Sequence, residues 1–75
     1  MKIHFSRHAR RRMKLYKIPA GRVTEAIDDP GRAQGHHEVV LQFTGFALPT
    51  KIFYEVEGET ITVVTAYPLK RGRTQ

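Results

Sequence analysis

The spacing of hydrophobic residues changes along the chain from a helical period to an extended one. Residues 7–16 contain no Gly or Pro, and apolar side chains recur at near-helical intervals from Phe5 through Ala9 and Met13. A narrow apolar stripe of this kind predicts an amphipathic helix. Ser6 directly precedes the stripe and suits the N-cap, because a serine hydroxyl can accept a hydrogen bond from a free amide of the first turn.

A second short helix is predicted from about Ala20 to Asp28. Its buried face would carry Val23, Ala26 and Ile27. Pro19 separates the two helices, because proline is tolerated at a helix start but not inside a helix. Asp29-Pro30-Gly31 then predicts a turn. At the N-terminus, Lys2–Phe5 is expected to form a short strand that leads into the first helix.

After Gly31 the pattern becomes extended. Three segments are rich in β-branched and aromatic residues, which favour strands: Glu38–Phe43, Pro49–Val56 and Thr60–Tyr67. Thr44-Gly45 and Glu57-Gly58 supply turn residues between them. The predicted fold class is α+β: two N-terminal helices packed on one face of a three- to four-stranded antiparallel sheet, in the order (β)ααβββ.

Length and composition narrow the classes of protein further. At 75 residues the chain is expected to form a single domain, 1–75, with a short basic tail over 69–75. A core this small leaves a thin stability margin, which favours a homodimer or another partner. The absence of cysteine excludes disulfides, thiolate zinc sites and thiol nucleophiles. No apolar run could span a bilayer and no secretory signal is visible, so the expected location is cytoplasmic.

Positive charge is the strongest compositional signal. Thirteen Lys and Arg against seven Asp and Glu give a formal net charge of +6, and the isoelectric point is near 10.2. This balance suits a polyanionic partner such as RNA, DNA or an acidic protein. A membrane is not expected, because the first helix lacks a large apolar face. Arg7, Arg11 and Lys14 share its outward side, and a simple solvated surface is the alternative interpretation.

Several motifs occur together in a known family. They are His8-Ala9-Arg10-Arg11-Arg12-Met13, Ile18 ahead of a short helix, Asp29-Pro30, and the last strand, Val63–Pro68. The chain resembles, from about Ser6 to Arg71, a family of small proteins catalogued as domain-of-unknown-function family forty-two fifty-eight. That family is similar in fold to the RelE, ParE and BrnT toxins. The resemblance implies a RelE-like architecture, RNA as a target (on the ribosome for some RelE-like proteins), and an acidic antitoxin as a protein partner.

The chain also departs from those toxins. A RelE-type C-terminal helix with a catalytic tyrosine is absent, since only seven residues follow Pro68. The order of motifs differs from that of BrnT. A catalytic set therefore cannot be carried over residue by residue, and the resemblance implies a fold more strongly than an activity.

His8 and Arg12 are the first candidates for chemistry. Cleavage of RNA without a metal requires one group to accept the 2′-hydroxyl proton, another to protonate the leaving 5′-oxygen, and cations to stabilise the phosphorane. Their spacing of four places both residues on one helix face, one turn apart. The alternative is structural, with His8 bonded to a turn and Arg12 paired with Glu38, Glu55 or a strand carbonyl.

The last two strands supply further candidates. Alternation predicts that Ile61, Val63, Thr65 and Tyr67 share one face. Tyr67 lies at the strand exit next to Lys70 and Arg71, where it could stack on a base or donate a proton. A rim tyrosine with a buried ring is the alternative. Lys51 is a candidate phosphate contact, whereas Tyr54 is expected in the core.

Four histidines raise the question of a metal. His4 and His8 have the spacing of helical zinc ligands, but His4 is expected in a strand. His36-His37 is expected to be a loop pair that enters a strand. No metal site or other cofactor is therefore predicted.

Two functions of different class remain open. The first is a toxin-like, RNA-directed protein that acts as a metal-independent endoribonuclease of a toxin–antitoxin pair. Its catalytic residues would be His8, Arg12 and Tyr67, and its nucleic-acid contacts Arg7, Arg11, Lys51, Lys70 and Arg71. The second is a non-enzymatic basic module that binds nucleic acid or an acidic partner protein. A plain scaffold, in which His8 and Arg12 hold helix to sheet, is a third interpretation.

Overall fold

The helices and strands lie close to where the hydrophobic pattern predicts them. A computed structural model describes residues 2–28, 33–46 and 48–69. The elements follow in the order β1 (Lys2–Phe5), α1 (Arg7–Tyr16), α2 (Ala20–Ile27), β2 (Gly35–Leu41), β3 (Thr50–Glu57) and β4 (Thr60–Pro68). The α+β class and the (β)ααβββ order are thus confirmed. The turn predicted at Asp29–Gly31 lies outside the described residues.

The sheet is mixed, which corrects the prediction of an antiparallel sheet. Its strand order is β1-β4-β3-β2. The two hairpin pairs are antiparallel, but β1 pairs parallel to β4, from Lys2 opposite Thr60 to Phe5 opposite Val63. A hairpin forces its strands to be antiparallel. No hairpin joins β1 to β4, because both helices and two strands separate them in the sequence.

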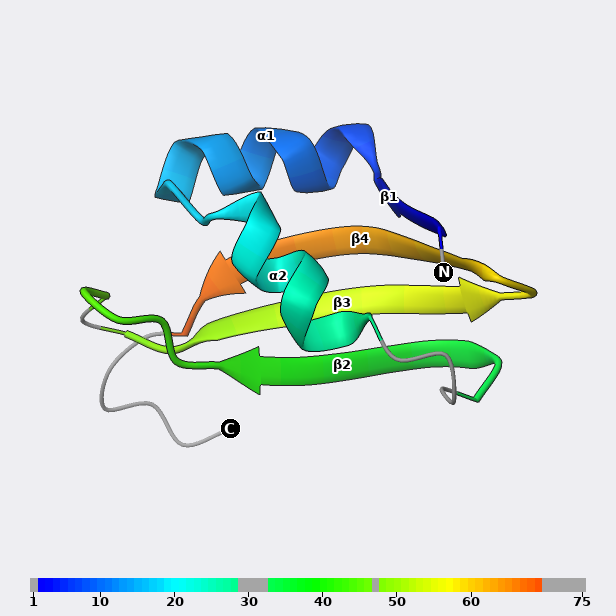
Figure 1. Ribbon diagram of the computed structural model, residues 1–75. Coiled ribbons are helices and arrows are strands. Elements are labelled where there is room, and N and C mark those ends of the chain that lie inside the picture. Colours follow the sequence, from blue (N-terminus) through cyan, green and yellow to red (C-terminus); the bar gives the residue numbers. More distant parts are fainter. Residues whose placement is uncertain (1, 29–32, 47, 70–75) are drawn as a thin grey trace.

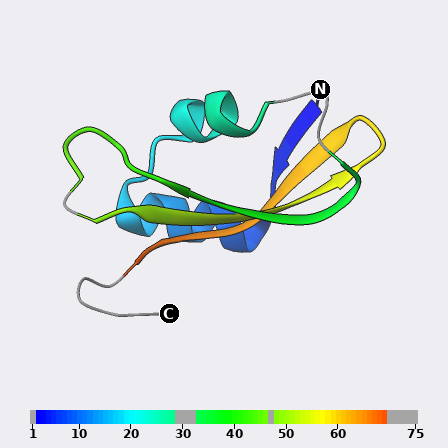
Figure 2. The ribbon, with the colours of Figure 1, turned by 90° about the horizontal axis from the view of Figure 1, so that it is seen from below.

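The two helices occupy different places on the sheet. α2 lies over one face, whereas α1 runs beside β4 at the edge of the sheet, roughly level with it (Figures 1 and 2). The prediction that both helices cover one face is therefore right only for α2. Ala9 of α1 is fully buried, and so small a side chain lets the helix approach closely. The opposite face of the sheet carries no helix among the described residues.

Ser6 joins the start of α1 to β4. Its hydroxyl accepts a hydrogen bond from the Ala9 amide at 3.0 Å and donates one to the Val64 carbonyl at 2.8 Å. The Ser6 amide donates to the Val63 carbonyl at 2.9 Å. The predicted N-cap is thus confirmed, and the same side chain also fixes where the helix meets the strand.

A β-bulge in β4 changes which of its residues face the core. Phe53 pairs with Thr65, but the next residue, Tyr54, pairs with Val63, so that Val64 has no partner on β3. A one-residue insertion moves every later side chain to the other face. The expected common face is therefore wrong: Ile61, Val63 and Ala66 are buried, while Thr65 and Tyr67 lie on the face away from α2.

The core lies between α2, the inner side of α1 and the covered sheet face. It consists of Ala9, Met13, Ile18, Val23, Ile27, Phe43, Ile52, Tyr54, Val56, Ile61, Val63 and Ala66. Tyr54 is 2% exposed, as predicted. The helical stripe and the face of α2 are both confirmed, because their apolar positions belong to this cluster or pack against it.

Candidate nucleic-acid interface

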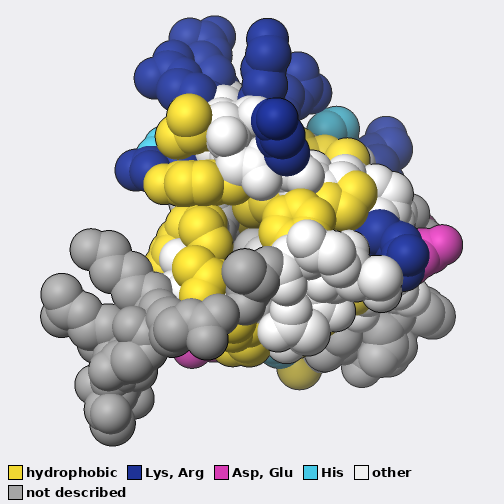
Figure 3. Space-filling view, turned by 90° about the vertical axis from the view of Figure 1, so that its left-hand side faces the viewer, with side chains coloured by type: hydrophobic (Ala, Val, Ile, Leu, Met, Phe, Trp, Pro, Cys, Tyr) yellow, Lys and Arg dark blue, Asp and Glu magenta, His cyan; other side chains and the backbone are white. Residues whose placement is uncertain are grey.

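The cations of α1 form the most concentrated charge on the described surface. Arg7, Arg10, Arg11 and Lys14 are exposed, and Arg12 is half-buried. Figure 3 shows Lys and Arg side chains gathered over this helix. α1 contains no acidic residue. Within ranges 2–28, 33–46 and 48–69, the ion pairs all lie on the sheet, and none involves a cation of α1.

This charge arrangement is unfavourable for the helix itself. The first turn of α1 holds no acidic residue but contains Arg7 and Arg10, where the positive end of the helix dipole favours anions. Like charges also stand four residues apart at Arg7 and Arg11, and at Arg10 and Lys14. Each such pair destabilises a helix by about 0.2–0.5 kcal/mol. The charges of α1 therefore work against the stability of the helix that carries them.

The helical period divides the side chains of α1 and its C-cap that lie outside the core into three groups. Arg10, Lys14 and Lys17 line a hollow between α1 and α2. Arg7 and Arg11 point away from the core, with Lys14 beside them at the border of the hollow. We call Arg7, Arg11 and Lys14 the outward face. His8, Arg12 and Leu15 occupy the third flank, on the side opposite the hollow.

His8 and Arg12 lie one turn apart on α1, as their spacing predicts. His8 is exposed, and it makes no hydrogen bond or ion pair with the described part of the chain. The Arg12 guanidinium donates a long hydrogen bond of 3.4 Å to the Tyr16 hydroxyl. The alternative in which Arg12 pairs with Glu38 or Glu55 is wrong, since both carboxylates hold other partners on the sheet.

Tyr67 and Lys51 meet on the uncovered face of the sheet. They are register partners on β4 and β3, and the rings of Tyr67 and Phe53 lie 6.1 Å apart. The Lys51 ammonium sits 3.0 Å from Glu38 and 5.3 Å from the centre of the Phe53 ring. The hydrogen bond to Glu38 raises the pKa of Lys51 above its ordinary value, although partial desolvation opposes this. We call these four side chains the sheet cluster.

The predicted site residues therefore fall into two groups. Arg7, His8, Arg11 and Arg12 stand together on α1, whereas Lys51 and Tyr67 belong to the sheet cluster, and no hydrogen bond or ring contact joins the groups. Lys70 and Arg71 lie outside the described residues. Tyr67 could not be placed from the sequence, because the bulge at Val64 decides which way it faces.

The histidines make local contacts. The expected loop pair is wrong, since His36 and His37 both lie in β2. His36 pairs with Glu55 at 3.0 Å on one face of the sheet. His37 stacks on Tyr54 on the other face and contacts the Ala33 carbonyl at 2.6 Å. A group of three or more His, Asp or Glu side chains that could hold a metal ion does not occur in the described ranges.

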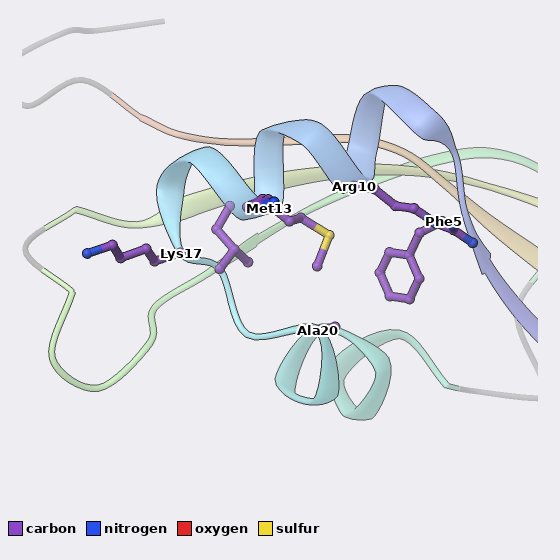
Figure 4. A pocket seen from close by; sticks show the side chains of 7 residues that line it. Phe5, Arg10, Met13, Lys17 and Ala20 are labelled. Carbon is purple, nitrogen blue, oxygen red and sulfur yellow. The ribbon is translucent and has the colours of Figure 1, made fainter.

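The hollow between the helices was missed at the sequence level. It is open to solvent and has a volume of about 550 Å³, and the Phe5 and Met13 side chains point into it from β1 and α1 (Figure 4). Ile18 and Ala20 complete an apolar floor. The sequence does contain one indication of the hollow, because Arg10, Lys14 and Lys17 lie along one side of the apolar stripe of α1. What the sequence did not reveal is that α2 stands away from α1 and leaves that side open.

Comparisons with other proteins add no family or relative. No family model matches the chain, and no curated protein or solved structure matches it significantly. The resemblance to the domain-of-unknown-function family, and the RelE-like architecture that it implies, stay predictions. Over the described residues, neither helix has the length and apolar character needed to cross a membrane.

Proposed function

We propose that the protein binds RNA through the outward face of α1, as a sequence-independent contact to the phosphate backbone. The observation that carries this proposal is the set of exposed cations on α1 that have no acidic partner among the described residues. Arg7, Arg11 and Lys14 span eight residues, or roughly 10.5 Å along the helix axis. Such a row of cations can follow a phosphate backbone.

The chemistry of the exposed side chains favours contact with phosphates over reading of bases. Arginine and lysine bind phosphate oxygens and can also bind guanine edges, whereas adenine edges are read mainly by Asn and Gln. α1 holds no Asn or Gln. Binding is therefore expected to depend on charge and salt, with little preference for sequence.

A salt titration tests the proposal. The measurement is fluorescence anisotropy of a labelled single-stranded RNA over a range of salt concentrations, with duplex DNA of the same length as a comparison. Three phosphate contacts predict that log affinity falls against log salt with a slope of about −2, since each contact on a single strand contributes about −0.7. Failure to bind RNA at low salt, or affinity that is independent of salt, would contradict the proposal.

RNA cleavage is a second candidate, favoured by one observation. The His8 ring is exposed and unpaired within the described structure, one turn from the Arg12 guanidinium. An imidazole beside a bound phosphate can accept the 2′-hydroxyl proton. Under this hypothesis His8→Ala abolishes cleavage of a labelled RNA while the affinity changes less than threefold. Equal cleavage by the variant would exclude His8 as the base, and no cleavage by the unaltered protein would leave binding alone.

A further inference from the structure

The hollow between α1 and α2 combines two chemistries that one ligand must satisfy. Its floor consists of the apolar side chains of Phe5, Met13 and Ile18, with Ala20 at the start of α2. Its rim carries the cations Arg10, Lys14 and Lys17, and no acidic residue lines it. The occupant must therefore present an apolar surface and negative charge on the same side.

Met13 and Ile18 are nearly buried, at 6% exposure each, so they form a firm floor. Lys17 adopts the left-handed conformation, with φ 57°, at the C-cap of α1. This cap turns the chain sharply between the helices, and hydrogen bonds from the Lys17 and Ile18 amides to the Lys14 and Met13 carbonyls fix it. The shape of the hollow is thus set by backbone bonding and packing.

We infer that this hollow is a docking site for an acidic amphipathic helix of a partner protein. Leucine-type side chains on one face of such a helix would cover the apolar floor, and carboxylates beside them would pair with the rim cations. Carboxylate–guanidinium pairs at Arg10 fix orientation as well as charge. The site is separate from the proposed RNA contact except at Lys14, which borders both.

Other occupants fit less well. Bases of RNA need aromatic faces to stack on, and among the lining residues only Phe5 is aromatic. A second copy of this chain carries the same net charge of +6, so that the copies repel each other. An acidic helix lowers that charge and offsets the repulsion between Arg10 and Lys14, which both line the hollow.

A designed peptide probes the site. It has about 18 residues, long enough for a helix to form on binding, with leucines on one face and glutamates flanking them. One control replaces the glutamates with glutamines, and a second replaces the leucines with glutamines but keeps the charge. Affinity is measured by anisotropy, and contact with the floor by the NMR shift of the Met13 methyl group.

The two control peptides separate docking from simple charge attraction. We expect each to bind at least tenfold more weakly than the probe, and only the probe to shift the Met13 methyl signal. Equal binding of the leucine-free control would overturn the inference, because charge alone would then suffice. A Met13 shift caused by RNA and not by the probe would also overturn it and would place the hollow within the nucleic-acid site.

Two variants locate the site on the protein. Arg10→Glu combined with Lys17→Glu is expected to weaken binding of the probe peptide at least tenfold, since both cations line the rim of the hollow. Arg7→Glu combined with Arg11→Glu makes the same change in net charge on the outward face. This variant is expected to weaken binding of the probe peptide less than threefold. Equal losses in both variants would contradict a defined site. The RNA contact can fail without affecting this result, because Arg7 and Arg11 are not in the hollow.

Discussion

Charges on α1 and charges on the sheet are used in opposite ways. On the uncovered sheet face, Lys51 pairs with Glu38 and His36 with Glu55, each at 3.0 Å. On α1, Arg7 and Arg11 stand exposed without an acidic partner among the described residues. The sheet therefore pairs the Lys51 charge with a carboxylate within the fold, whereas α1 presents Arg7 and Arg11 to the outside.

The difference matters because exposed ion pairs and unpaired cations have different consequences. A surface pair contributes little to stability and leaves no net field. A row of unpaired cations raises the local potential and attracts polyanions, while it destabilises the helix that carries it. Basic residues in this chain are thus not equivalent, and position decides which of them can serve a ligand.

The largest expected effect contrasts these two regions directly. Arg7→Glu with Arg11→Glu should lower RNA affinity roughly 30-fold or more at low salt, and should make the salt slope shallower by about 1.4, because two phosphate contacts are lost. The measurement is the salt titration by anisotropy. The control is Lys51→Glu with Lys2→Glu, which makes the same change in net charge on the sheet and should weaken binding less than threefold. Equal losses would show that only total charge matters.

Ser6→Ala is expected to have the next largest effect, on stability. The Ser6 hydroxyl caps α1 and also bonds to Val64 at the bulge. Loss of an N-cap lowers the free energy of unfolding by about 0.5–2 kcal/mol. For a domain of this size, each kcal/mol lowers Tm by roughly 4–8 °C. Thermal unfolding followed by circular dichroism measures it. An unchanged Tm would mean that neither bond matters.

Arg7→Glu alone should raise stability while it weakens RNA binding. A glutamate in the first turn interacts favourably with the helix dipole, and its pairing with Arg11 replaces a repulsion. The expected gain is about 0.5–1 kcal/mol, measured by urea unfolding. Arg7→Gln is the matched control variant, and its free energy of unfolding should increase less than that of Arg7→Glu. A destabilised Arg7→Glu protein would show that Arg7 has a structural role.

The smallest effect concerns Lys51 at alkaline pH. Glu38 raises the pKa of Lys51. The pair therefore contributes its full stabilisation of the fold below the ordinary lysine pKa of 10.5, and this stabilisation is lost as pH rises through the raised pKa. The difference in Tm between the unaltered protein and Lys51→Met should therefore be constant at lower pH and shrink as pH rises above about 10.5. A constant difference would mean that Lys51 acts by packing on Phe53.

The sequence predicted most elements because their signals are local. The apolar stripe of α1, the Ser6 cap and the strand composition depend on neighbouring residues. The direction of β1 and the edge position of α1 depend on contacts between distant segments. The prediction of which sheet face Tyr67 occupies failed because Val63 and Val64 are both apolar, so that the alternation of apolar and polar residues could not reveal the bulge. Similarly, composition could not show that Lys51 is paired and Arg7 is not.

The most direct test maps the RNA contact residue by residue. Amide signals of the labelled protein are followed by NMR during titration with a short single-stranded RNA at low salt. We expect the largest shifts at Arg7, Arg11 and Lys14, with those at Lys51 and Tyr67 much smaller. Shifts centred on the sheet cluster, with α1 unchanged, would contradict the central claim that the unpaired cations of the helix form the interface.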